Sequence, residues 1–367
     1  MRATVWTVAN ALGVVAGTPG ELLTALLAGP RRRPDRVALP ADAPGLPELA
    51  ADLRAVGRVE VTVAGPAPDG AAPGEQPPLS DPAAVCAADP VRVTRAYEAE
   101  PAGHGGLRTA WLRAGQALVR QGQTPATRAL TLLAALPADA VPRLRPALAA
   151  LAADAPWAVA DVRDARAGAL TVRAGRLVEA DDPRARAVAC LEDGTVLTLD
   201  ERGRLRTAGS AAPRLVAAVA ATLATHPATA LAAAGDAVLT GDRMGSVHAF
   251  TLGGLHQASL HAGRVTALAA AGPRVYSGGD DGTVLAWRPG AGDGVPVARR
   301  PHPVVALHAG PRTLAVAWAD GLVELRDPRT RRVRPFRPGP AVHAVAVFPD
   351  GSLTVATDTS TVRLRPT

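Results

Sequence analysis

Hydrophobic and polar positions form short alternating elements through residues 1–66. Thr18 and Glu21 make a capping box, which predicts the start of a helix because both side chains can pair with free amides of its first turn. Residues 58–64 alternate and are rich in β-branched side chains, a pattern typical of a strand. The predicted order is an apolar segment at 4–15, helix 21–28, strand 36–39, helix 46–56 and strand 58–64. Residues 1–66 are therefore predicted to form a small α/β segment.

The pattern changes to a helical period after a linker rich in proline and glycine at residues 67–79. Leu107, Trp111, Ala114 and Leu118 recur every three or four residues, as one face of a helix does. The helices expected in the region 80–154 are 80–88, 91–98, 107–120, 125–136 and 141–153. Helical hairpins of this kind either connect and pack against their neighbours or leave a groove for a partner helix.

An internal repeat replaces the helical period in the C-terminal half. Turn residues at 203, 245, 282, 321 and 360 recur with a period of about 40. The first four are glycines, which tolerate the positive φ of a tight turn between strands. Several copies also contain a preceding apolar strand and a second turn, so each unit holds about four strands, as a propeller blade does. Residues 155–367 are predicted to form a β-propeller of five visible blades, or six or seven with degenerate ones, and the fold class is mainly β.

Residues 261–287 hold the most regular copy, HAGRVTALAAAGPRVYSGGDDGTVLAW. This copy resembles the WD-repeat family, and weaker copies extend the resemblance over residues 184–367. The resemblance implies a structural tetrad of His261, Ser277, Asp281 and Trp287. In that tetrad Asp281 accepts a hydrogen bond from His261, His261 reaches the Ser277 hydroxyl, and Ser277 meets the Trp287 indole N–H. Such a network fixes the geometry of a blade and does no chemistry.

Closure of the ring is left open by the sequence. The last copy ends after its third strand, at 361–365, and so lacks an outer strand. WD-repeat proteins commonly fill that gap with a strand from the N-terminal end of the propeller, and residues 169–173 and 176–180 are the suppliers expected here. A degenerate extra blade formed by residues 157–182 is the competing interpretation.

The amino-acid composition indicates the kind of genome that encodes the protein and the class of partner that it binds. All 40 basic residues are Arg, and neither Lys nor Ile occurs, as expected of a very GC-rich genome such as that of an actinobacterium. The net charge of +7 invites a nucleic-acid partner. The Arg residues are dispersed, however, and aromatic side chains that could stack on bases are scarce, with two Tyr and three Phe in the whole chain. These features argue against nucleic acid.

Neither a catalytic nor a metal site emerges from the reactive residues. Cys86 and Cys190 lie in Ala-rich stretches without a neighbouring His, and no phosphate-binding loop is present. His226, His261 and His302 each open a repeat, which places them far apart on a ring. We expect no enzyme activity, no cofactor and no metal, and a cytoplasmic protein without a membrane span. Residues 3–17 resemble a weak signal peptide, although a buried first element is the preferred interpretation.

A binding surface is the remaining functional hypothesis. The candidates are side chains that leave the regular repeat: Arg243, Met244, Arg264, Trp318 and Arg337. Trp318 is a candidate because tryptophan is enriched at binding hot spots. Its alternative role is packing inside the ring. The predicted function is a protein-interaction scaffold or adaptor. The resemblance implies bacterial multi-protein systems containing an AAA-type ATPase, a protease or a signalling kinase. Two alternatives are a ligand-binding or enzymatic role for residues 1–66 and a structural subunit that offers an unpaired strand edge to a neighbour.

Overall fold

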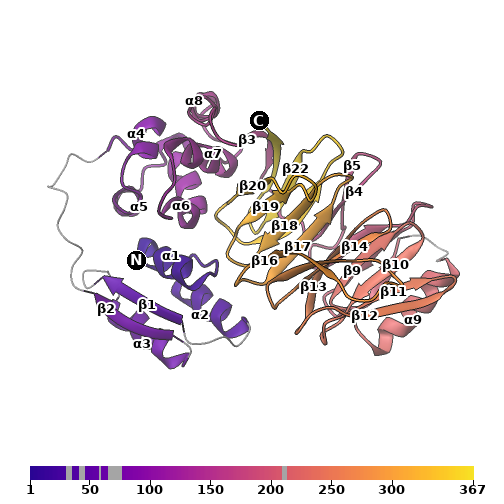
Figure 1. Ribbon diagram of the computed structural model, residues 1–367. Coiled ribbons are helices and arrows are strands. Elements are labelled where there is room, and N and C mark those ends of the chain that lie inside the picture. The colour runs from indigo at the N-terminus through magenta and orange to yellow at the C-terminus, as the bar shows by residue number, and fades with distance from the viewer. Residues whose placement is uncertain (30–34, 41–45, 58, 65–76, 209–212) are drawn as a thin grey trace. The chain divides into compact units, whose positions relative to one another are not determined.

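The computed structural model describes residues 1–29, 35–40, 46–57, 59–64, 77–208 and 213–367 (Figure 1). The chain forms two compact units. One comprises Met1–Val162 with Arg337–Ala341 and Thr367, and the other comprises Arg163–Phe336 with Val342–Pro366. Within the described residues, no helix is long and apolar enough to cross a membrane.

The α/β segment is built around a pair of parallel strands. Its elements are α1 (Arg2–Leu12), α2 (Pro19–Ala28), β1 (Asp35–Pro40), α3 (Leu46–Ala55) and β2 (Val59–Ala64). Parallel strands need a crossover connection, and α3 supplies it between β1 and β2. The capping box is confirmed, because the Thr18 hydroxyl accepts from the Glu21 amide at 3.2 Å and the Glu21 carboxylate accepts from the Gly17 amide at 2.7 Å. The expected ligand site after these strands lies in residues 41–45 and 65–76, outside the described residues.

The helical region follows the predicted period. Its helices are α4 (Pro82–Ala87), α5 (Pro90–Ala99), a 3-10 turn η1 (His104–Gly106), α6 (Leu107–Leu118), α7 (Pro125–Ala135) and α8 (Leu144–Leu151). Trp111 is fully buried on α6, and its indole N–H donates to the Thr94 hydroxyl at 3.0 Å. The apolar run at the N-terminus forms α1, which packs on α6. A Cβ on Gly115 would lie 2.1 Å from the Trp6 ring, so only glycine permits this approach.

The C-terminal half forms a five-bladed β-propeller. Blade one is β6 (Ala187–Cys190), β7 (Val196–Leu199) and β8 (Leu205–Thr207); blade two is β9 (Ala230–Ala234), β10 (Ala237–Gly241), β11 (Ser246–Thr251) and β12 (Gly254–Ser259). Blade three is β13 (Val265–Ala271), β14 (Arg274–Gly279), β15 (Thr283–Trp287) and β16 (Val295–Arg299); blade four is β17 (Val304–Ala309), β18 (Leu314–Trp318), β19 (Val323–Arg326) and β20 (Val333–Phe336). Blade five holds β21 (Val342–Val347), β22 (Leu353–Thr357) and β23 (Thr361–Pro366).

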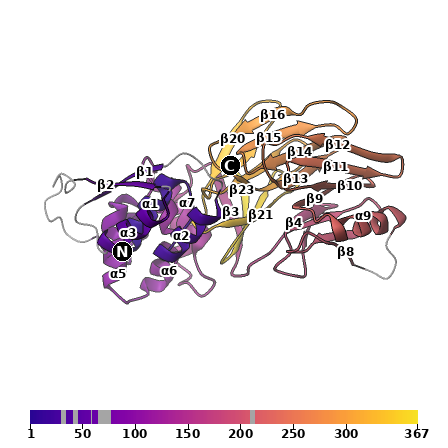
Figure 2. The ribbon, with the colours of Figure 1, turned by 90° about the horizontal axis from the view of Figure 1, so that it is seen from below.

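Blade one departs from the predicted four strands. A helix, α9 (Arg214–Thr225), follows β8 and packs beside it (Figure 2). The helix buries Val216, Val219 and Leu223 in the core of that blade. His226 caps the end of α9 and lies just before β9, so it opens blade two as predicted, but it is exposed whereas His261 is buried. The sequence missed this helix because its alanine-rich apolar run is also compatible with a buried strand.

The closure of the propeller ring also differs from the prediction. The outer strand of blade five is β3 (Trp157–Arg163), in the sheet order β21-β22-β23-β3, and not residues 169–173 or 176–180. Those residues form a separate hairpin, β4 (Leu170–Arg173) with β5 (Arg176–Glu179), whose inner strand contacts both β6 and β21. The hairpin therefore completes the ring as a two-stranded, degenerate element between blades one and five.

A buried histidine anchors this hairpin. His308 at the end of β17 accepts a hydrogen bond at Nδ1 from the Val347 amide at 3.1 Å, and its Nε2 accepts one from the Val172 amide of β4 at 3.3 Å. Nε2 faces the Thr171 hydroxyl on β4 at 3.4 Å. Burial lowers the pKa of His308 to about 4, so the ring stays neutral at physiological pH.

Candidate functional site

One end of the blades is organised by the repeated glycine. The carbonyl of Gly203 accepts from the Ala228 amide at 2.9 Å, that of Gly245 from the Leu260 amide at 3.0 Å, and that of Gly282 from the Arg300 amide at 2.9 Å. In each case a turn between the second and third strands meets the segment that follows the same blade. We call this end the turn face, made of the turns at 200–203, 242–245 and 280–282 with those following segments.

Glycine is required at these turns for two reasons. Gly203, Gly245 and Gly282 have φ of 77°, 94° and 77°, a region that other residues rarely adopt. A Cβ at Gly282 would also lie 2.1 Å from the Arg300 carbonyl oxygen, and one at Gly245 would lie 2.1 Å from that of His261. The period that predicted the propeller therefore reflects a close backbone approach repeated from blade to blade.

Three of the four tetrad residues come together in blade three. The His261 Nε2 lies 2.8 Å from the Ser277 hydroxyl, and its Nδ1 lies 3.2 Å from Asp281 Oδ1. Thr283, which the sequence analysis did not name, joins them with its hydroxyl 2.7 Å from the same carboxylate oxygen. The Ser277–Trp287 link was wrong: the Trp287 indole N–H donates to the Ala291 carbonyl at 3.2 Å. The indole is turned toward the loop between β15 and β16.

Asp281 couples this network to pH. Burial alone raises the pKa of Asp281, but hydrogen bonds from His261 and Thr283 outweigh burial and hold the pKa well below its usual range. A carboxylate whose pKa is lower in the folded than in the unfolded protein stabilises the fold at pH values above the unfolded pKa, near 3.9. This stabilisation is lost as the pH falls through the folded-state pKa.

Asp281→Asn should therefore cost about 1–2 kcal/mol of unfolding free energy at pH 7, and this deficit should shrink progressively below about pH 4. Urea denaturation of both proteins between neutral and acidic pH measures the difference. A deficit that stays constant through that range would show that the charge of Asp281 does not hold the network.

Blade four replaces the tetrad with a different buried arrangement. Trp318 pairs with Val304 at the ladder position that Gly279 has in blade three. Its side chain is fully buried, and its indole N–H donates to the Glu324 carboxylate at 3.0 Å. Arg300 covers the ring with its guanidinium carbon 5.4 Å from the ring centroid. Trp318 is therefore a core residue, in agreement with the packing role given above as its alternative.

Arg243, Met244 and Arg264 meet on the turn face. The Asp242 carboxylate accepts from the Met244 amide at 2.8 Å, and the Asp242 carbonyl accepts from the Val265 amide at 2.9 Å. This places the turn beside Arg264. Met244 is 76% exposed, unusually so for a large apolar side chain.

Arg264 lies in a positively charged environment. Burial lowers the pKa of its guanidinium most, and the positive charge of Arg186 lowers the pKa next. The negative charge of Asp280 raises the pKa, and the positive charge of Arg243 lowers it. Its Nε is buried and has no hydrogen-bond partner among the described residues. Arg186 also lines the central channel, whose volume of about 60 Å³ is far below that of typical ligand pockets. This channel is therefore too small to hold a typical substrate.

Arg337 is assigned to the N-terminal unit. It begins the segment Arg337–Ala341, which is part of the N-terminal unit. A Cβ on Gly339 in this segment would lie 2.5 Å from the Ala114 Cα of α6. Arg337 therefore falls in a different unit from Arg243, Met244 and Arg264.

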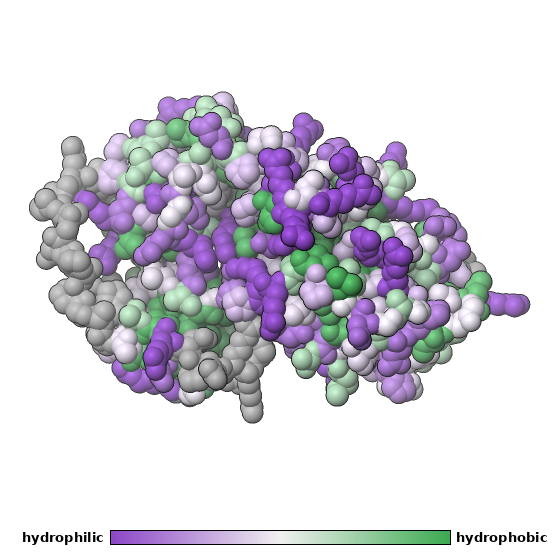
Figure 3. Space-filling model, viewed as in Figure 1, coloured by the Kyte–Doolittle hydropathy of each residue, from purple (hydrophilic) through white to green (hydrophobic). Residues whose placement is uncertain are grey.

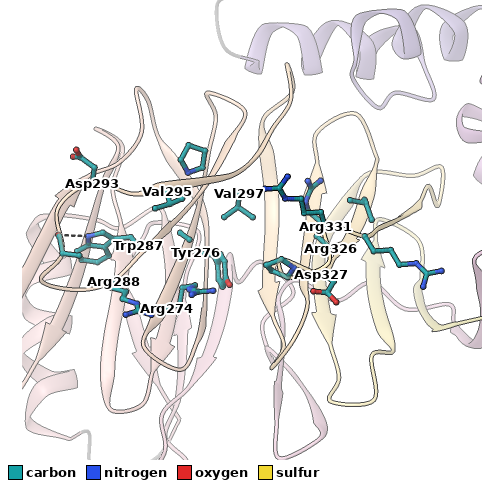
Figure 4. A pocket seen from close by; sticks show the side chains of 16 residues that line it. Arg274, Tyr276, Trp287, Arg288, Asp293, Val295, Val297, Arg326, Asp327 and Arg331 are labelled. Carbon is teal, nitrogen blue, oxygen red and sulfur yellow. Dashed lines mark hydrogen bonds between the residues drawn. The ribbon is translucent and has the colours of Figure 1, made fainter.

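A larger pocket opens between blades three and four. Its volume is about 760 Å³, within the range of ligand pockets. Tyr276, Val295 and Val297 line it from blade three, while Arg326, Asp327 and Arg331 face it from blade four (Figure 4). The sequence does not reveal this pocket, because residues that line it are up to 59 positions apart, from Arg274 to Val333.

The two cysteines are unfavourably placed for nucleophilic chemistry. Burial raises the pKa of the Cys86 thiol to about 12, and burial also raises the pKa of Cys190. Across the part of the chain that the structure describes, no group of three or more His, Cys, Asp or Glu residues is arranged to hold a metal ion.

Comparison with known proteins shows similarity of structure alone. No protein-family model matches the sequence, and no curated protein matches it. The computationally designed protein Ika8 is 20% identical, with 55% of this chain and 71% of that chain covered at a TM-score of 0.40. The designed protein Ika4 is 26% identical, with 39% of this chain and 92% of that chain covered at a TM-score of 0.35. The five-bladed assignment rests on the sheets described above.

Proposed function

We propose that this protein is a non-catalytic interaction scaffold that binds a partner protein through the turn face of its propeller. The observation that carries the proposal is the meeting of exposed Met244 with Arg243 and Arg264. Methionine adapts its shape to an apolar partner surface, and arginine is enriched among residues that dominate binding energy. The backbone hydrogen bonds of the glycine turns hold this surface in place, so little order has to be gained on binding.

The finer parts of the proposal follow the sequence resemblance. The propeller is of a divergent WD-repeat type, in which the His261–Ser277–Asp281 network survives in blade three. The protein acts in the cytoplasm as an accessory subunit of a bacterial multi-protein system. An AAA-type ATPase, a protease or a signalling component is the proposed class of partner, and nucleic acid and membranes are not.

A matched pair of substitutions on one blade tests the turn face. Met244 and Leu252 are both exposed apolar residues of blade two, at 76% and 85%, but they lie in turns at opposite ends of its strands. Met244→Asp should weaken binding of the native partner at least tenfold, because it places a charge where an apolar contact is made. Leu252→Asp should leave binding unchanged.

The measurement is a pull-down from native cytoplasm with the full chain as bait, followed by titration of the recovered partner. The proposal fails if wild-type protein recovers no stoichiometric partner. It also fails if Met244→Asp binds as wild type, or if Leu252→Asp loses binding equally.

A further inference from the structure

The pocket between blades three and four is a second surface, separate from the turn face. Arg288 follows the end of β15, whereas Gly282 of the turn face precedes its start. The two sites therefore lie at opposite ends of the same strand.

Positive charge dominates the lining of this pocket. Five arginines line it, against two aspartates, Asp293 and Asp327: Arg274, Arg288, Arg326, Arg331 and Arg332. Arg326 is paired with the Glu324 carboxylate at 2.8 Å. Within the described residues, the other four arginines form no ion pair with the protein. Like charges gathered on one concave surface repel each other and attract an anion.

The Arg-rich turn of blade four is held rigidly toward the pocket. The Asp327 carboxylate accepts from the Arg329 amide at 2.8 Å and the Thr330 amide at 3.2 Å. These two hydrogen bonds lower the pKa of Asp327, because they stabilise its negatively charged form. The charge of Asp327 therefore holds the amides of the turn. Arg331 has a φ of 58°, a left-handed conformation that is costly for a residue with a Cβ. The backbone of the turn thus holds Arg331 and Arg332 beside the pocket.

The charged surface extends beyond one pocket. A neighbouring cavity of about 210 Å³ shares Arg274 and Arg288 with the first, and it adds Arg312 and Arg329. In Figure 3 hydrophilic side chains gather over the region of β19 and β20, with hydrophobic side chains between them. A track of this kind fits an extended ligand that carries several negative charges.

The chemistry of the lining selects among anionic ligands. Tyr276 and Trp287 are only 5% and 2% exposed, so neither offers a face on which a nucleic-acid base could stack. A second copy of this chain is disfavoured by its own net charge of +7. Pro296 interrupts the amide donors of the edge strand β16, which makes pairing with an added strand unfavourable. Recognition therefore depends on guanidinium–carboxylate contacts, which are charge-assisted and directional.

We infer that the groove lined by Arg274, Arg288, Arg331 and Arg332 binds an extended acidic segment of a partner protein, rich in Asp or Glu. This gives the propeller two binding surfaces, and the inference does not depend on the function proposed for the turn face.

A short fluorescein-labelled oligoglutamate peptide, titrated into the full chain, tests the inference by fluorescence anisotropy. The double substitution R274E/R331E should weaken binding about tenfold or more, because it reverses one charge on each side of the groove. The matched control R176E/R184E changes the net charge by the same amount, at two exposed residues in or near the β4–β5 hairpin. It should bind the peptide as wild type does. Raising the salt concentration from about 0.05 to 0.5 M should weaken wild-type binding.

Three outcomes would overturn the inference: no peptide binding at low salt, equal weakening in both double variants, or tighter groove-dependent binding of a single-stranded oligonucleotide than of oligoglutamate. Because all four substituted residues are exposed, unchanged thermal unfolding of each variant ensures that a loss of binding reports on charge. A second variant, Arg332→Glu, should weaken peptide binding in the same direction.

Discussion

Replacing Trp318 with alanine is expected to lower the unfolding free energy of the protein by about 3–5 kcal/mol. The indole is fully buried in the core between blades three and four, next to Val304, Val316 and Leu322. Its removal leaves a cavity, and it also takes the hydrogen-bond donor from Glu324 and the aromatic face from Arg300. Urea denaturation followed by far-ultraviolet circular dichroism measures the loss.

Trp318→Phe is the control that separates ring packing from polar contacts. Phenylalanine keeps an aromatic face beneath Arg300 but cannot donate to Glu324, which would still accept from Arg326 at 2.8 Å. We expect a smaller loss, about 1–2 kcal/mol. If Trp318→Ala were as stable as wild type but lost partner binding, Trp318 would be a binding residue after all.

Gly282→Ala is expected to lower the unfolding free energy by about 3 kcal/mol, since strain and a steric clash act together. Its φ of 77° is unfavourable for alanine, and the added Cβ would lie 2.1 Å from the Arg300 carbonyl oxygen. Relief requires the segment entering blade four to move away, which would break the hydrogen bond from the Arg300 amide to the Gly282 carbonyl.

Gly175→Ala provides a closely matched control. Gly175 has nearly the same φ, 74°, but a Cβ there would have nothing within 4 Å. This variant should lose only the backbone cost, about 1–2 kcal/mol. Equal losses for the two variants, measured by the same denaturation, would show that the contact with the next segment does not hold the blades together.

The local elements were predicted well because their causes are local. The capping box of Thr18 and Glu21 forms as expected, and the spacing of Leu107, Trp111 and Leu118 places them inside the helical region. The period of the turns predicted five blades, because four of the five turns repeat one backbone requirement that glycine meets. The network of His261, Ser277 and Asp281 could also be predicted, since the sequence of blade three resembles a family in which these positions are linked.

The candidate surface was predicted only in part. Arg243, Met244 and Arg264 do meet, because they leave the repeat at a turn whose position the period defines. Trp318 leaves the repeat in the same way but points into the core, since substitution of a small residue by a large one does not reveal which side has room. Trp287 kept its position and changed its hydrogen-bond partner, which a motif cannot show.

The sequence by itself determined the order of the elements, the propeller and the residues of its turns, because hydrophobic period, capping and positive φ act over a few neighbouring residues. Tertiary structure alone decided that β3 closes blade five, that the β4–β5 hairpin completes the ring, and that α9 replaces a strand. It also brought Arg274 of one blade and Arg331 of the next to one pocket. These outcomes depend on which distant segments pack side by side, and packing between distant segments leaves no period in the chain.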